Sequence, residues 1–169
     1  MLEIEKRYKL IGDIPKDKIK SQYRIEQVYS NISPDVRVRK ITDIDGKESY
    51  FHTVKYILKS GVREEIEQSI TEEQYDRIFE IINKIPVIKD RYLINLGNSL
   101  VAEIDHFIDT NKIIVEVEFP DETTMNNFIK PDWIGSEINN KQSYSVFVFS
   151  KINNELSGIQ KLQYYIDMN

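Results

Sequence analysis

The stretch Glu3-Ile4-Glu5-Lys6-Arg7 near the N-terminus carries the pattern that decides the fold. Successive side chains of a β-strand point to opposite faces, so Glu3, Glu5 and Arg7 share one face with no apolar residue among them. An ordinary half-buried strand would place an apolar row on that face. The stretch therefore predicts a strand whose charged face is not turned to a hydrophobic core.

Charged residues occupy alternate positions in five further segments of the chain. These are Arg37 and Arg39; Arg63, Glu65 and Glu67; Lys89 and Arg91; Glu103 and Asp105; and Glu116 and Glu118. Burying a charge is unfavourable unless it is paired, or bound to a metal or a ligand. An interior lined by both signs therefore predicts a site for a phosphate compound and a divalent cation. For any one strand, the alternative is a flat sheet with its charged face in solvent.

Alternation and enrichment in Val, Ile, Tyr and Phe predict about eight strands. They lie near 2–10, 22–30, 36–42, 49–58, 62–69, 87–96, 99–108 and 112–119. Turn signals such as Asp45-Gly46 and Gly97-Asn98 lie between them and predict antiparallel neighbours. We expect an α+β fold, a closed eight-stranded antiparallel β-barrel with the charged rows in its lumen and helices packed on the outside.

Helices are predicted between and after these strands. A capping box at Thr71 and Gln74 precedes an apolar stripe, and a proline opens a short helix near 15–21. Further helices are expected near 121–130, 141–152 and 155–167. The chain predicts a single domain, with the barrel over residues 1–152 and a C-terminal helical tail over 153–169. The tail is a candidate to cap the barrel or to join two subunits in a homodimer.

The composition of the 169-residue chain narrows the choice of partners. The 23 Lys and Arg against 28 Asp and Glu give a net charge of −5, which argues against nucleic-acid polymers and anionic membranes as partners. Without cysteine, thiolate zinc sites and cysteine nucleophiles are excluded, and with only two histidines a metal should be hard and carboxylate-bound. No apolar run of roughly 18 residues and no signal-peptide pattern occurs, so we expect a cytoplasmic protein.

The charged motifs also follow a familiar order. They are Glu3-x-Glu5-x-Arg7, Val36-Arg37-Val38-Arg39, Thr53-Val54-Lys55, Arg63-x-Glu65-x-Glu67, Lys89-x-Arg91, Glu103-x-Asp105 and Val115-Glu116-Val117-Glu118. This series resembles the motifs of the CYTH superfamily, the triphosphate tunnel metalloenzymes. Its members include class IV adenylate cyclases, thiamine triphosphatases and inorganic tripolyphosphatases. The resemblance covers residues 2 to about 145, and the first motif is similar to the ExExK signature of the family.

The resemblance implies a tunnel in which basic side chains clamp a triphosphate and carboxylates hold Mg²⁺ or Mn²⁺. The implied phosphate ligands are Arg7, Arg37, Arg39, Lys55, Arg63, Lys89 and Arg91. The implied metal ligands are Glu3, Glu5, Glu116 and Glu118. The residues expected either to bind metal or to orient the arginines are Glu65, Glu67, Glu103 and Asp105. The candidate catalytic residues are Glu5, Arg7 and Lys55.

Arg7 stands where the family signature has lysine. A guanidinium stays protonated, so Arg7 is expected to clamp phosphate, and a metal-polarised water is the expected nucleophile. The expected function is metal-dependent hydrolysis of the terminal phosphoanhydride of inorganic tripolyphosphate or of a small organic triphosphate. The alternatives are a class IV-type adenylate cyclase and a non-catalytic sensor that binds a polyphosphate or a nucleotide.

Overall fold

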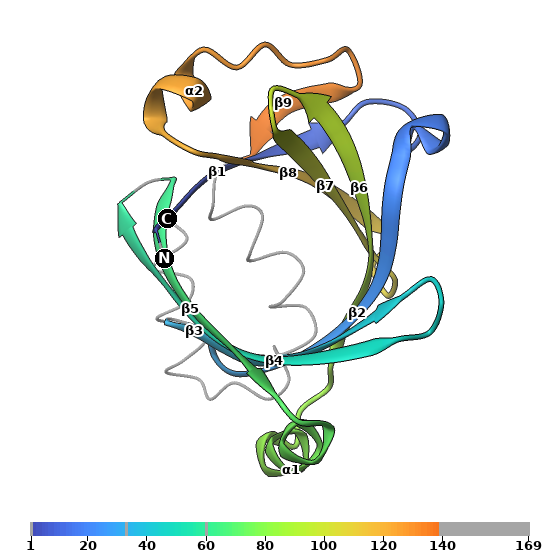
Figure 1. Ribbon diagram of the computed structural model, residues 1–169, viewed down its shortest axis with the longest axis vertical. Coiled ribbons are helices and arrows are strands. Elements are labelled where there is room, and N and C mark those ends of the chain that lie inside the picture. Colours follow the sequence, from blue (N-terminus) through green and yellow to red (C-terminus); the bar gives the residue numbers. More distant parts are fainter. Residues whose placement is uncertain (1, 33, 60, 139–169) are drawn as a thin grey trace.

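The computed structural model describes residues 2–32, 34–59 and 61–138. In these residues, antiparallel strands form one sheet that curves into a barrel (Figure 1). The strands are β1 (Leu2–Leu10), β2 (Ile19–Ile32), β3 (Asp35–Asp43), β4 (Glu48–Lys59), β5 (Val62–Ile70), β6 (Val87–Gly97), β7 (Leu100–Phe107), β8 (Lys112–Phe119) and β9 (Ile134–Ile138). The helices are the 3₁₀ helix η1 (Lys16–Lys18), α1 (Glu72–Ile82) and α2 (Glu122–Asn126). None of these helices is long and apolar enough to cross a membrane.

Strand β1 closes the barrel. Its residues from Ile4 to Tyr8 pair with β8, and on the other edge its first residues, from Leu2 to Ile4, pair with β5. From Arg7 onward, β9 takes over that second edge. The strand order is β5-β4-β3-β2-β6-β7-β8-β1, and the β5–β1 pairing completes the ring. The predicted closed eight-stranded antiparallel barrel is therefore confirmed, with β9 as an additional strand.

The apolar faces of the strands point outward and pack beneath the helices. Helix α1 lies outside the barrel (Figure 1), and its Tyr75 packs in a cluster with Val28 and Val38. The predicted capping box begins this helix, because Gln74 N donates to Thr71 Oγ1 at 3.1 Å and Thr71 N donates to Gln74 Oε1 at 2.9 Å. A second apolar cluster, formed mainly by β6, β7, β8 and β1, packs against the segment from α2 to β9.

Four predicted helices differ from the structure or lie outside it, and one observed strand was not predicted. The helix predicted near 15–21 is only the 3₁₀ turn η1, because Ile19 already pairs with Ile94 in the sheet. The helix predicted near 121–130 spans only Glu122–Asn126. Strand β9 was not predicted. The helices predicted near 141–152 and 155–167 lie outside the described residues, as does the tail.

Candidate functional site

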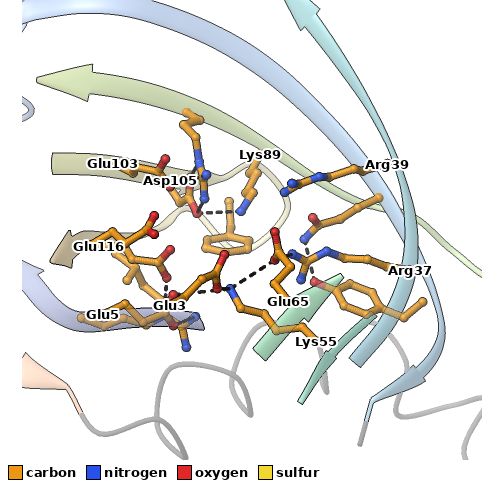
Figure 2. Close-up of a pocket in the computed structure, with 17 residues that line it drawn as sticks. Glu3, Glu5, Arg37, Arg39, Lys55, Glu65, Lys89, Glu103, Asp105 and Glu116 are labelled. Carbon is orange, nitrogen blue, oxygen red and sulfur yellow. Dashed lines mark hydrogen bonds and ion pairs between the residues drawn. The ribbon is translucent and has the colours of Figure 1, made fainter. Parts of the chain in front are cut away.

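A cavity of about 220 Å³ lies in the barrel lumen, and all eight barrel strands contribute to its lining. Thirteen of the fifteen residues predicted for the site line this cavity, several of them labelled in Figure 2. The acidic members are Glu3, Glu5, Glu65, Glu103, Asp105, Glu116 and Glu118, and the basic members are Arg7, Arg37, Arg39, Lys55, Lys89 and Arg91. The alternation that predicted a charged lumen thus brings both signs together in one cavity.

The other two predicted residues, Arg63 and Glu67, are not part of the cavity lining. Arg63 is 2% exposed, and its Nη1 lies 2.8 Å from Glu5 Oε1. Glu67 accepts hydrogen bonds from Arg39 Nη2 and, at 3.1 Å, from Thr53 Oγ1. In this arrangement both residues therefore reach the site through a neighbouring charged side chain.

Four uncharged residues line the cavity and were not predicted as site residues: Gln27, Tyr29, Phe107 and Ile114. The first two belong to β2, where Gln27 Nε2 donates to Tyr29 OH at 2.7 Å. Gln27 lies directly opposite Arg39, and Tyr29 directly opposite Arg37. Cross-strand neighbours share a face, so the pairing of β2 with the paired-arginine strand is the signal that could have found them.

Glu5 is the centre of the first ion-pair cluster. Its Oε1 lies 2.8 Å from both Arg7 Nη2 and Arg63 Nη1, and its Oε2 lies 3.4 Å from Lys55 Nζ. Lys55 Nζ also lies 2.5 Å from Glu3 Oε2. Burial would lower the pKa of Lys55, but the surrounding carboxylates, led by Glu5, raise it above its ordinary value. Lys55 therefore stays protonated and is suited to binding phosphate.

Asp105 is the centre of the second ion-pair cluster. It accepts hydrogen bonds from Lys89 Nζ at 2.6 Å and from Arg91 Nε and Nη2 at 2.6 and 2.8 Å. Burial would raise the pKa of Asp105, but Arg91 and Lys89 hold it at about 2. Burial and the nearby Arg91 lower the pKa of Lys89 to about 8. In this arrangement Asp105 orients two basic side chains toward the cavity.

Two further pairs fix the arginines of the lumen. Arg7 Nε donates to Glu116 Oε2 at 2.6 Å, and Arg37 Nη1 donates to Asp35 Oδ2 at 2.6 Å. Burial would raise the pKa of Glu116, but the adjacent cations, led by Arg7, hold it well below its usual range. Asp35 is buried and was not predicted as a site residue. These pairs hold the guanidinium groups in place before any phosphate is bound.

The carboxylates concentrate on β1, β7 and β8, which we call the acidic wall. Glu5 lies directly opposite Glu118, and Glu103 directly opposite Glu116. Like charges that face each other across strands are destabilising. Burial, together with the charges of Glu3 and Glu103, raises the pKa of Glu118 to about 7. At Glu118, the acidic wall therefore carries more negative charge than the nearby cations offset.

The basic groups Arg37 and Arg39 lie across the lumen from the acidic wall (Figure 2). Such an arrangement has room for a polyanion on one side and a cation on the other. In the described part of the chain, no three His, Asp or Glu side chains converge closely enough to hold a metal ion as they stand. Glu3 and Glu116 instead contact Lys55 and Arg7. The donors are carboxylate oxygens with opposed like charges, a chemistry that fits Mg²⁺ or Mn²⁺.

The acidic wall predicts a specific pH dependence of stability. The pKa of Glu118 in the folded protein, about 7, lies above its ordinary value of 4.5, so between these values the folded state binds more protons than the unfolded state. Stability should therefore fall as the pH rises from about 5 to about 7. Urea denaturation of the wild type and of Glu118→Gln at several pH values measures this contribution. We expect a flatter curve for Glu118→Gln, and identical slopes would assign the effect to other groups.

Comparison with known proteins agrees with this geometry. The chain is 34% identical over 146 residues to an inorganic triphosphatase of Acetivibrio thermocellus, covering 84% of this chain and 88% of that protein. It is 29% identical over 150 residues to an inorganic triphosphatase of Nitrosomonas europaea, covering 85% of this chain and 93% of that protein. The crystal structure of an inorganic triphosphatase matches with a TM-score of 0.57 and 25% identity, over 87% of this chain and 93% of that one. No protein-family model matches the chain. With its ordered motifs, its barrel and these relatives, the chain belongs to the inorganic triphosphatase family of the CYTH superfamily.

Proposed function

We propose that this protein hydrolyses the terminal phosphoanhydride of inorganic tripolyphosphate. The observation that carries the proposal is a single cavity in which six cations face seven carboxylates. Phosphoryl transfer depends mainly on positioning and on neutralising charge, and this lining provides for both. The triphosphatase relatives, aligned over more than four fifths of the chain, support the same reaction.

The basic side chains are suited to hold a compact polyanion. Arg37 and Arg39 alternate on β3, and guanidinium groups can donate two parallel hydrogen bonds to phosphate oxygens. Each is also placed near an aromatic ring, with Cζ of Arg37 and of Arg39 5.9 Å from the ring centroids of Tyr29 and Phe51, respectively. The small volume and the charged lining of the cavity favour a triphosphate without a large organic group.

We further propose that the triphosphate binds with Mg²⁺ or Mn²⁺, held by Glu3, Glu5, Glu116 and Glu118. Such an ion would polarise phosphate oxygens and lower the pKa of a bound water. The same carboxylates neutralise Lys55 and Arg7 in this structure. A cation bound to them would therefore leave both basic side chains available to phosphate oxygens.

The experiment that tests the function is phosphate release from tripolyphosphate, ATP, GTP, thiamine triphosphate and pyrophosphate, each with Mg²⁺, with Mn²⁺ or with chelator. We expect rapid release from tripolyphosphate that depends on the divalent ion. Chromatography of the ATP reaction would detect cyclic AMP, whose formation with pyrophosphate would replace the hydrolase with a cyclase. Triphosphate binding without any product would indicate a sensor.

Arg7→Lys tests whether this position supplies a base. The Arg7 guanidinium donates to both Glu5 and Glu116, so a lysine placed there should stay protonated between two carboxylates. We expect an unchanged pH profile of kcat/KM and a loss of about tenfold in its value, because the ammonium cannot reproduce the forked contact. A new alkaline limb in the profile would show that an amine at this position does act as a base.

A further inference from the structure

Arg39 is held differently from most cations of the cavity. Arg7, Lys55, Lys89 and Arg91 all pair with carboxylates that themselves line the cavity. Arg39 Nη2 instead donates to Glu67, whose side chain is 30% exposed and is not part of the lining. A carboxylate outside the cavity thus determines where a cation inside it is placed.

A buried threonine donates a hydrogen bond to the carboxylate that holds Arg39. Thr53 on β4 is directly opposite Arg37 of β3 on one side and directly opposite Glu67 of β5 on the other. Its Oγ1 donates to Glu67 Oε2 at 3.1 Å, and the same oxygen accepts from Arg39 Nη2. Thr53 is fully buried, so its hydroxyl has one fixed environment. The hydroxyl therefore restrains the carboxylate that in turn restrains the guanidinium.

The guanidinium of Arg39 retains unused hydrogen-bonding capacity. Phe51, directly opposite Arg39 on β4, supports it with a ring centroid 5.9 Å from Cζ. Its Nε is buried and has no hydrogen-bond partner among the residues that the structure describes. A buried charged donor without an acceptor is unfavourable, and an incoming anion would relieve this. Arg39 is therefore prepared to bind an anionic group in the cavity.

We propose that Thr53 is a positioning residue for substrate binding. Its hydroxyl holds Glu67, and Glu67 holds the Arg39 guanidinium where it meets a phosphate group of the triphosphate. This inference rests on the proposed function. Without the hydroxyl, the partly exposed Glu67 is free to turn to solvent, and Arg39 loses its preferred orientation. Affinity should fall while the chemical step, which we assign to groups on β1, β4 and β8, proceeds at its usual rate.

The test compares Thr53→Val, which keeps the shape of the side chain, with Thr53→Ser, which keeps the hydroxyl. We expect Thr53→Val to raise KM for tripolyphosphate, and its Kd by calorimetry, about five- to tenfold, with kcat within about twofold of wild type. Thr53→Ser should restore wild-type values. Ser69→Ala is the matched control. It removes a hydroxyl from β5 on the face that also carries Glu67, at the position directly opposite Phe51.

A double-mutant cycle separates positioning from a structural role. If Thr53 acts through Arg39, Thr53→Val should have no further effect on Kd in an Arg39→Lys background. Equal losses in both backgrounds would overturn the proposal, as would an unchanged KM in Thr53→Val. Glu67→Gln, at a partly exposed position, gives a second route if Thr53→Val folds poorly, and it should raise KM likewise. A wild type that neither binds nor hydrolyses tripolyphosphate would instead refute the proposed function.

Discussion

Asp105→Ala is expected to lower the free energy of unfolding by about 3–5 kcal/mol, the usual cost of removing one partner from a buried ion pair. Asp105 contacts both Lys89 and Arg91 in the barrel lumen, and the three side chains are at most 15% exposed. In the variant, Arg91 still contacts Glu103, whereas Lys89 loses the carboxylate of Asp105, so Lys89 is the cation most affected. Urea denaturation at pH 7 measures the loss. A change below about 1 kcal/mol would show that water enters the lumen and replaces the carboxylate.

The effect of Asp105→Ala should also depend on pH in a defined direction. The pKa of Asp105 is about 2 in the folded protein and 3.8 ordinarily, so its contribution is complete above the ordinary value. As the pH falls from about 4 to about 2, the unfolded state takes up the proton first and the difference between wild type and variant shrinks. Asp90→Ala is the matched control. Its partner Arg24 has a side chain 54% exposed, so a loss of about 0–1 kcal/mol is expected.

Most of the barrel could be predicted because six of its eight strands carry charge at alternate positions. Enrichment in Val, Ile, Tyr and Phe identified the remaining two, β2 and β4, so that all eight strands of the ring were predicted. Strand β9 was not predicted because it has only five residues and includes a glycine. Gly135 packs so closely on β1 that an added Cβ would lie 3.0 Å from the carbonyl oxygen of Lys9. That close approach is a tertiary contact with no signal in local alternation.

The sequence predicted which face of each charged strand lines the lumen, but it did not predict which side chains extend into the cavity. Alternation placed Arg63 and Glu67 on the lumen side, yet it could not show that Glu5 and Arg39 intervene between them and the cavity. The pattern of charged residues also gave no signal for Gln27, because its side chain is uncharged. Distances across a lumen depend on strand tilt and side-chain conformation as well as on side-chain length, and a single sequence gives only the length.

In the proposed reaction the acidic wall and the basic side chains of the cavity have separate tasks, and Glu5 of the acidic wall contacts three basic side chains. Its one carboxylate contacts Arg7, Arg63 and Lys55, and it is only 4% exposed. Replacing it with glutamine keeps the shape and removes the charge. The cations around it then attract anions more strongly, while the acidic wall loses a ligand proposed for the metal. Binding and bond cleavage should therefore respond in opposite ways.

Glu5→Gln is accordingly expected to reduce kcat for tripolyphosphate by about 10²–10³-fold, the range typical of removing one group that stabilises a transition state. The Kd for tripolyphosphate, measured by calorimetry with chelator present, should stay the same or decrease. Glu64→Gln is the matched control on the outer face of β5, where Glu64 accepts a hydrogen bond from Tyr56, and both constants should remain at wild-type values. If Glu5→Gln lost binding and cleavage together while its melting temperature was preserved, Glu5 would belong to the phosphate clamp. A loss of cleavage alone would place bond breaking on the acidic wall and substrate capture on the basic side chains that face it.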